Sequence, residues 1–328
     1  MRRSMKNVIS LFLLSMGVSS LMAQINEFKI DVQQTGAPIQ STMYGIFFED
    51  INFGADGGLY AELIKNRSFE FENPFGGWVP FGNITVQTKS PCFDKNPHYV
   101  RLSYNKELTG TGLDNEGFKG IGIKAGEKYD FSFYARTVTN GTIKFRINLV
   151  NSEHDIYETK EVEINGKDWK KYSVVLTPEA TEAHSRLRIT MLTQGTADLE
   201  HISLFPQKTF NNRPNGMRAD LAQALKDLKP GVFRFPGGCI VEGTNLATRY
   251  QWKNTVGPVE NRPININRWN YTFPHKKFSD YYQSYGLGFF EYFQLSEDIG
   301  AEPLPVLNCG LSCQYELSLI HISEPTRL

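Results

Sequence analysis

The alternation of apolar and polar residues changes character twice along the chain. Between residues 77 and 206, short segments alternate with period two and are separated by Gly, Asn, Asp and Pro turns. Several short alternating strands at regular spacing are typical of an antiparallel β-sandwich, because each strand then buries one face. The sequence therefore predicts a sandwich inserted between two stretches of different character. Its clearest segments are HYVRLSYN, KYDFSFYARTV, TIKFRINLV, KKYSVVLT, SRLRITMLT and LEHISLF.

The flanking stretches follow the rhythm of a βα-repeat with a parallel sheet. Residues 217–230 place Leu221, Leu225 and Leu228 at helical spacing and end at a Pro-Gly pair. A short buried strand then arrives at the tight turn 236–238, where two adjacent glycines permit positive φ or close approach to a ligand. Because the carboxyl ends of strands carry the chemistry in such folds, we expect this turn to form an active-site wall.

Further elements fit the same pattern. Residues 25–32 alternate and predict a strand, and residues 43–48 predict a buried strand that ends at Glu49 and Asp50. A carboxylate at this position is either part of a functional site or a solvent-exposed residue of a loop. Its chemistry alone does not decide between these alternatives. A second helix precedes a buried strand that ends at Asn308. The apolar positions of that helix are Phe289, Phe290, Phe293 and Ile299.

Composition excludes some classes of function. The chain has 35 basic and 35 acidic residues, and this balance does not favour nucleic acid or an anionic membrane as a partner. Aromatic residues make up 13% of the chain, which fits a surface that stacks on sugar rings, although ordinary core packing accounts for most of them. Within the predicted sandwich, the candidates for a sugar-stacking face, with core packing as the alternative for each, are Trp78, Phe81, Phe118, Tyr134 and Trp169.

The amino terminus has the pattern of a secretory signal. A basic start, MRRSMK, is followed by the apolar run VISLFLLSMGVSSLMA, with Ala23 before a plausible cleavage point. No later segment reaches transmembrane length. We therefore expect a soluble mature protein, exported to the periplasm or the extracellular space, without membrane insertion.

The sequence lacks the motifs of several other chemistries. It contains no phosphate-binding glycine loop, no HExxH and no GxSxG, and its six histidines show no ligand spacing. Cys92, Cys239, Cys309 and Cys313 are too few for a disulfide scaffold and are expected to be free or buried thiols. No metal or cofactor is therefore expected. The remaining candidate groups are carboxylates, amides and aromatics around the mouth of a βα-barrel. Glycosidases use groups of these kinds.

Four motifs in order carry a resemblance to a known family. They are YGIFFEDINFGADGGLYAELIKNRSFE, RFPGGCIVEG, WKNTVGPVENRP and the helix and strand GFFEYF…PVLNCG. These motifs resemble the amino-terminal part of family-51 α-L-arabinofuranosidases, and the predicted sandwich resembles an inserted carbohydrate-binding module. The resemblance implies a (β/α)8 barrel, of which about the first three strands are present, interrupted by an antiparallel sandwich of galactose-binding-like jelly-roll type. It also implies a carboxy-terminal β-sandwich, to which the strand at 25–32 would belong.

The resemblance implies five segments along the chain. They are a signal peptide (1–23), the first strands of the catalytic region (24–76), the inserted sandwich (77–206), the continuation of the barrel (207–316) and an unrelated tail (317–328). The tail, LSLIHISEPTRL, resembles the translation of a sequencing adapter, so we expect that the reading frame ran off a genomic insert. The alternative is a genuine helix start with Ser323 as the N-cap.

The implied reaction is retaining hydrolysis of terminal α-L-arabinofuranosyl groups from arabinan or arabinoxylan. It needs an acid and a nucleophilic carboxylate about 5–5.5 Å apart. In the family these glutamates follow the fourth and seventh barrel strands, so the resemblance implies that both are absent here and that the chain as written is inactive. Homo-oligomers are common in the family.

The resemblance implies that this chain contains the residues that form one wall of an arabinose-binding pocket. Glu49 matches a glutamate that hydrogen-bonds sugar hydroxyls, and Trp269 matches a tryptophan near the glycosidic linkage. Gly238 precedes Cys239 at the glycine turn, where many members have Asn in place of the cysteine, so that hydrogen bond does not carry over. Asn308 ends the third strand. The alternatives are that Trp269 only packs its loop and that Asn308 caps the next helix.

Two other functions stay open at this point. One is a non-catalytic carbohydrate-binding protein whose folded unit is the sandwich. The other is a retaining barrel glycosidase for another glycan, such as a xylanase or glucanase, for which the departure at Cys239 leaves room.

Overall fold

The structure is a computed structural model that describes residues 27–51, 53–107, 110–269 and 281–312. The expected signal peptide and tail, and Cys313, lie outside the described residues. Residues up to Gln40 form a unit of their own, whose described part contains no strand. The strand expected at 25–32 is therefore wrong over its described positions, where the apolar side chains are exposed. Alternation alone does not stabilise a strand, which also needs a neighbouring strand and an apolar surface to cover.

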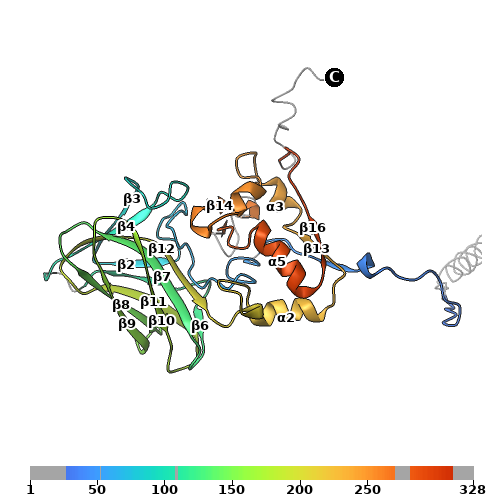
Figure 1. Ribbon diagram of the computed structural model, residues 1–328, viewed down its shortest axis with the longest axis horizontal. Helices are drawn as coiled ribbons and strands as arrows, with labels where there is room; N and C mark the ends of the chain where they lie inside the picture. Colours follow the sequence, from blue (N-terminus) through green and yellow to red (C-terminus); the bar gives the residue numbers. More distant parts are fainter. Residues whose placement is uncertain (1–26, 52, 108–109, 270–280, 313–328) are drawn as a thin grey trace, which may run out of the picture. The chain divides into compact units, whose positions relative to one another are not determined.

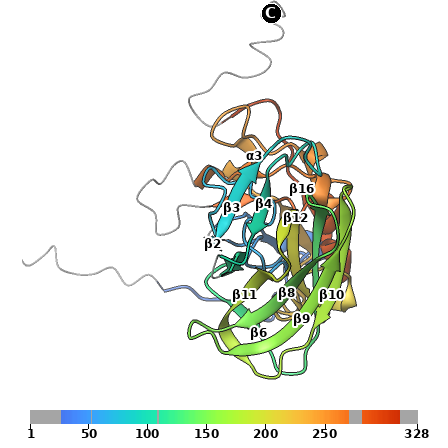
Figure 2. The ribbon, with the colours of Figure 1, turned by 90° about the vertical axis from the view of Figure 1, so that its left-hand side faces the viewer.

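The antiparallel sandwich predicted from the alternation is confirmed. One sheet has the strand order β10-β7-β12-β4-β3, and the other has the order β2-β5-β11-β8-β9 with β6 paired to β11 (Figure 1, Figure 2). The strands are β2 (Trp78–Phe81), β3 (Asn83–Gln87), β4 (Tyr99–Tyr104), β5 (Gly112–Asn115), β6 (Ile121–Ile123), β7 (Tyr129–Thr137), β8 (Ile143–Val150), β9 (Ile156–Ile164), β10 (Lys170–Leu176), β11 (Glu182–Met191) and β12 (Gly195–Pro206).

Strict alternation places the core between the two sheets. Along β7, Phe131, Phe133 and Ala135 are fully buried, and Leu187 and Ile189 of β11 belong to the same core cluster. Burial of each large apolar side chain contributes about 1.5–3 kcal/mol. The residues between them on β7 therefore point away from the core, onto the outer face of the five-stranded sheet.

A small parallel sheet with helices makes up the α/β part. Its order is β1-β13-β16, with parallel pairing throughout, and the helices α2 and α5 pack on each other and on this region (Figure 1). The prediction of a parallel α/β region is confirmed at this level. The elements are β1 (Gly45–Phe47), β13 (Val232–Phe235), β16 (Glu302–Pro305), α2 (Ala219–Asp227) and α5 (Phe289–Ile299).

The two edge strands of this sheet were expected to be buried, and that expectation is wrong. Phe47 of β1 and Leu304 of β16 are each about half exposed. Each strand has one strand neighbour among the described residues, so only the central strand β13 is covered on both sides. Phe233 and Phe235 of β13 are accordingly fully buried.

Both predicted helices are present, and their buried faces agree with the expectation in part. In α2 the predicted Leu225 packs partly buried against the core, whereas Leu221 and the C-cap residue Leu228 are exposed. In α5 Phe289 and Ile299 are buried as predicted, whereas Phe290 and Phe293 are exposed. Helical spacing marks an apolar stripe, but the neighbouring strands decide which part of it is covered.

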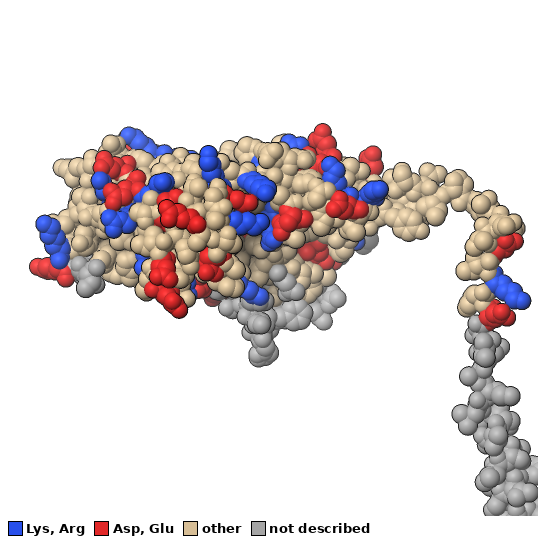
Figure 3. All heavy atoms as spheres, turned by 90° about the horizontal axis from the view of Figure 1, so that it is seen from below, with Lys and Arg blue, Asp and Glu red and all other residues tan. Residues whose placement is uncertain are grey.

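The remaining short elements belong to the loops. They are η1 (Ser41–Met43), η2 (Phe210–Asn212), α3 (Cys239–Glu242), η3 (Trp252–Thr255), η4 (Val259–Asn261), β14 (Asn265–Ile266) and β15 (Tyr282–Gln283). No helix among the described residues is long and apolar enough to cross a membrane. Acidic and basic side chains are interspersed on the face seen in Figure 3, in keeping with the zero net charge.

Candidate functional site

The glycine turn that follows β13 packs directly against the end of β1. Gly237 has φ +148°, and a Cβ at this position would lie 2.7 Å from Cγ of Glu49. Glycine is therefore required, as the sequence indicated, both for the backbone conformation and for this close approach. After the turn the chain enters the short helix α3.

Glu49 is oriented by the backbone of α3. The N–H of Ile240 donates a hydrogen bond to Glu49 Oε1 at 3.1 Å, and no hydrogen bond from a described residue reaches Oε2. The side chain is half-buried. One carboxylate oxygen is therefore held in place by the protein at the carboxyl end of β1.

The other predicted site residues lie around the same short helix. Gly238 is the N-cap of α3 and Cys239 is its first residue. Trp269 packs against the apolar cluster that contains Ile240. Asn308 donates to the carbonyl oxygen of Val241 at 2.7 Å, so its amide ties the end of β16 to α3. The five residues thus come together, while their roles toward a sugar stay predictions.

Asp50, which the sequence marked only as a neighbour of Glu49, holds the long loop against β1. It is 2% exposed, and its Oδ1 accepts hydrogen bonds from the Tyr281 hydroxyl at 2.5 Å and from the Ala55 N–H at 2.9 Å. Its carbonyl oxygen accepts a hydrogen bond from Asn267 Nδ2 at 3.0 Å, two residues before Trp269. No sequence pattern links positions so far apart, so these partners were not predictable.

Burial, and next the negative charge of Asp56, raise the pKa of Asp50 to about 6. Since this folded-state pKa lies above the unfolded value, the contribution of Asp50 to the free energy of unfolding is fully present below about pH 4 and is lost as the pH rises through about 6. Asp50→Asn should remove this contribution. We therefore expect the difference in unfolding free energy between wild type and the variant to be up to about 3 kcal/mol larger at pH 4 than at pH 7. Urea unfolding at both pH values measures this, and a difference independent of pH would contradict it.

Arg262 anchors the long loop that leads from the glycine turn to Trp269. It is 3% exposed, and its two Nη atoms donate to the two carboxylate oxygens of Glu291, each at 2.8 Å. It also donates to the carbonyl oxygens of Gly257 and Tyr285. This paired, fully buried guanidinium fixes the loop to the start of α5.

The sandwich contacts the same loop through one buried side chain. Asn96 Nδ2 donates to the carbonyl oxygens of Glu260 and Arg262, both at 2.9 Å, and its Oδ1 accepts from the Ile264 N–H. The loop that carries Trp269 is therefore held from the sandwich side as well as from α5.

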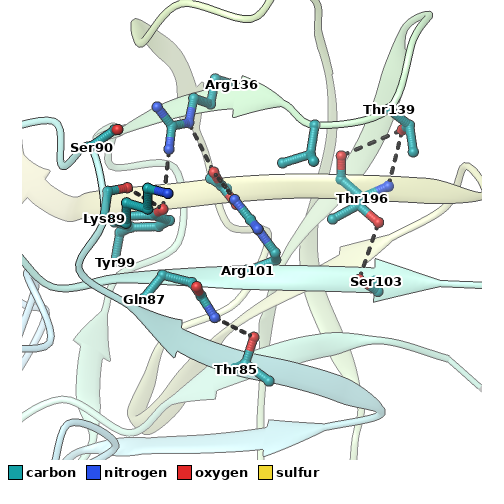
Figure 4. Close-up of polar contacts among 12 residues, drawn as sticks. Thr85, Gln87, Lys89, Ser90, Tyr99, Arg101, Ser103, Arg136, Thr139 and Thr196 are labelled. Carbon is teal, nitrogen blue, oxygen red and sulfur yellow. Dashed lines mark hydrogen bonds and ion pairs between the residues drawn. The ribbon is translucent and has the colours of Figure 1, made fainter.

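The aromatic residues considered for a sugar-stacking face are largely engaged by the protein itself. Trp78 is buried and donates to the carbonyl oxygen of Asn66, as the core alternative required. The Arg136 guanidinium lies 4.5 Å from the Trp169 ring, and Tyr99 meets that ring edge-on. Arg101 and Arg136 converge on the outer face of the five-stranded sheet (Figure 4), where both bind the buried Asp198. Stacking of these rings on sugars stays a prediction.

Two of the cysteines that the structure describes, Cys92 and Cys309, carry free thiols. Burial raises the pKa of the Cys92 thiol to about 12. No group of His, Cys, Asp and Glu among the described residues could hold a metal ion.

An antiparallel sandwich beside an α/β region, with a carboxylate and a glycine turn at the strand ends, agrees with the glycoside-hydrolase class. Comparison with known protein families supports this class. Residues 224–324 match the α-L-arabinofuranosidase 1 domain, and residues 61–197 match a carbohydrate binding domain.

Individual relatives agree on the activity of the family. The chain is 39% identical over 297 residues to an extracellular exo-α-L-arabinofuranosidase of Streptomyces chartreusis, covering 85% of this chain and 34% of that protein. It is 36% identical to α-L-arabinofuranosidase 1 of Arabidopsis thaliana, covering 88% of this chain and 43% of that protein.

Among solved structures, the arabinose-bound α-L-arabinofuranosidase MgGH51 is similar, with a TM-score of 0.75 and 33% identity, over 83% of this chain and 45% of that one. The chain therefore corresponds to the amino-terminal region of the family-51 α-L-arabinofuranosidases, with its β-sandwich. It spans less than half the length of these relatives.

Proposed function

We propose that this chain supplies the sugar-binding wall of an exported enzyme that removes terminal α-L-arabinofuranosyl groups from arabinan or arabinoxylan with retention. The observation that supports this most directly is Glu49, which is oriented by the Ile240 N–H and leaves Oε2 open. A carboxylate in a fixed orientation makes strong hydrogen bonds with sugar hydroxyls and so discriminates their positions. In this proposal Trp269 and the 236–238 turn flank the bound sugar.

The proposal places the catalytic pair in further polypeptide. Retaining hydrolysis needs two carboxyl groups about 5–5.5 Å apart. Asp50 is engaged by Tyr281 and Ala55, which leaves Glu49 as the open carboxylate at the end of β1. We therefore expect the acid and the nucleophile to follow later barrel strands. The open edge of β16 is where a further parallel strand would continue such a barrel.

We further propose that the protein is exported and that its sandwich contacts polysaccharide. The Streptomyces relative is named as extracellular, which agrees with export through the signal predicted at 1–23. The match of residues 61–197 to a carbohydrate binding domain favours contact of the sandwich with plant polysaccharide.

The test compares this chain with the complete product of its native gene, read across the codons for residues 314–328. We expect the complete product to hydrolyse an aryl α-L-arabinofuranoside but not an aryl β-xyloside, and the present chain alone to hydrolyse neither. Hydrolysis of the xyloside would favour a different barrel glycosidase. Arabinofuranoside hydrolysis by this chain alone would contradict the placement of the catalytic pair.

A second candidate function follows from the carbohydrate-binding match alone. In it the sandwich binds glycan and the rest of the chain has no catalytic role. Retention of the chain on arabinan or arabinoxylan, together with inactivity of the complete gene product, would support this alternative over the enzyme.

A further inference from the structure

The connection between β3 and β4 carries a side chain of the sandwich into the α/β region. Within this connection Phe93 and Asn96 form an isolated antiparallel bridge, and the Phe93 ring packs edge-on against Tyr134 of β7 with 4.9 Å between ring centroids. Asn96 is 2% exposed. The connection therefore presents one buried amide from a support that is fixed on the five-stranded sheet.

That amide satisfies three main-chain groups of the long loop at alternate positions. Its Nδ2 donates to the carbonyl oxygens of Glu260 and Arg262, both at 2.9 Å, and its Oδ1 accepts from the Ile264 N–H at 3.3 Å. Asparagine suits this place because one planar group carries two donor hydrogens and an acceptor. Since buried polar groups without a partner are costly, loss of the amide should release residues 260–264.

A second contact of the sandwich with this stretch is weaker. The Tyr134 hydroxyl donates to Glu260 Oε1 at 3.1 Å, and Lys171 Nζ lies 3.5 Å from the same oxygen. The Lys171 side chain is 47% exposed, and ion pairs of this kind contribute little. The buried Asn96 amide is therefore the stronger of the two contacts.

The stretch that Asn96 holds leads directly to the end of β1. Strand β14 begins one residue after Ile264 and pairs with β15. Asn267, the next residue after β14, donates to the carbonyl oxygen of Asp50 at 3.0 Å. Asp50 follows Glu49 in the chain, so a shift of the loop would reach the main chain beside the Glu49 carboxylate.

The same stretch also reaches the short helix that orients Glu49. Arg268 Nη1 donates to the carbonyl oxygen of Gly243, the C-cap of α3, at 3.1 Å. Trp269 follows and packs against the apolar cluster that contains Ile240. The loop thus connects Asn96 of the sandwich to both sides of the pocket proposed above.

We propose that Asn96 is a positioning residue for this pocket, so that the sandwich is a structural part of the substrate-binding site and not only a module joined by its linkers. Asn96 acts through the loop that carries Trp269 and needs no contact with the substrate. The inference rests on the proposed function, because the pocket is the one proposed to hold the arabinofuranosyl group.

The kinetic test measures kcat and KM of the complete gene product on an aryl α-L-arabinofuranoside. We expect Asn96→Ala to lower kcat/KM about 10- to 100-fold, because displacement of a positioning segment by about 1 Å has effects of this size. The matched control is Asn148→Ala. Asn148 is also a buried asparagine of the sandwich, at 3% exposure, but its Nδ2 donates to the Thr159 hydroxyl of β9 at 2.6 Å. This control should keep the wild-type kcat/KM, and equal losses in the two variants would overturn the proposal.

A double-variant cycle separates positioning from general destabilisation of the sandwich. If Asn96 acts through the loop that carries Trp269, Asn96→Ala should have a much smaller effect on kcat/KM in a Trp269→Phe background than in the wild-type background. The same fold-loss in both backgrounds would show that Asn96 does not act through this loop.

Acrylamide quenching of Trp269 fluorescence in the present chain tests the positioning without any hydrolysis. The Trp269 signal is the difference between each protein and its Trp269→Phe counterpart. Asn96→Ala should increase the quenching of this residue, and Asn148→Ala should not. If quenching changes in this way but the complete gene product does not hydrolyse the arabinofuranoside, the proposed function fails and the positioning of the loop by Asn96 stands. Unchanged quenching in Asn96→Ala would refute the positioning role, whatever the activity.

Discussion

Replacing Arg262 with methionine is expected to lower the free energy of unfolding by about 3–5 kcal/mol. The guanidinium is 3% exposed and is bound by both oxygens of Glu291 and by the carbonyl oxygens of Gly257 and Tyr285. Methionine fills much of the space but removes the guanidinium donors from these carbonyls and leaves the Glu291 carboxylate with the Gly288 N–H, at 3.0 Å, as its only donor among the described residues. A buried charge that loses its partner costs far more than an exposed one. Urea unfolding followed by tryptophan fluorescence measures the loss.

The matched control is Arg218→Met. Arg218 also makes a two-point ion pair, with Asp220, but the side chains are 43% and 66% exposed. Solvent-exposed pairs contribute about 0–1 kcal/mol, so this variant should unfold almost as wild type does. Similar losses for the two variants would show that Arg262 does not anchor the loop as described.

The sandwich was predictable because its strands obey a local rule. Each of the six segments read from the sequence contains a strand, since a two-sided sheet requires an apolar residue at every second position. The sandwich strands outside these six segments are β2, β3, β5, β6 and β9. Of these, β9 is long, but it lies at the edge of its sheet, and its outward positions carry lysine and glutamate, which obscure the alternation.

The helices show the limit of a periodic pattern. The spacing predicted both α2 and α5, and the predicted Phe289 is buried against Phe235 of the central strand. Tyr292 was not predicted to face the strand, yet it stacks on Phe235 with 4.7 Å between ring centroids, whereas Phe290 is exposed. The position of β13 relative to the helix decided the outcome.

Part of the candidate site was predictable because it depends on local features of the sequence. Strand ends and glycine turns are visible in a sequence, and they pointed to Glu49 and to the turn that now packs against it. The network that holds them was not visible. Asp50 meets Tyr281, and Asn96 meets Arg262, across more than 160 residues of intervening chain. Contacts of this kind depend on how the sandwich and the α/β region pack, which no local pattern encodes.

The second large effect is expected at Glu49. In the complete gene product, Glu49→Gln should lower kcat/KM for an aryl α-L-arabinofuranoside about 10- to 100-fold, because a charge-assisted hydrogen bond to the sugar contributes about 1.5–3 kcal/mol. Glutamine keeps the size of the side chain and an oxygen that accepts from the Ile240 N–H. The free energy of unfolding should therefore change little, which separates a binding role from a structural one.

Glu49 at the end of β1 is proposed to form the wall of an arabinofuranosyl-binding pocket. This role is tested by measuring kcat/KM of the complete gene product for this substrate, with Glu or Gln at position 49. We expect a loss of at least about tenfold with unchanged stability. Equal kcat/KM for the two proteins would contradict it.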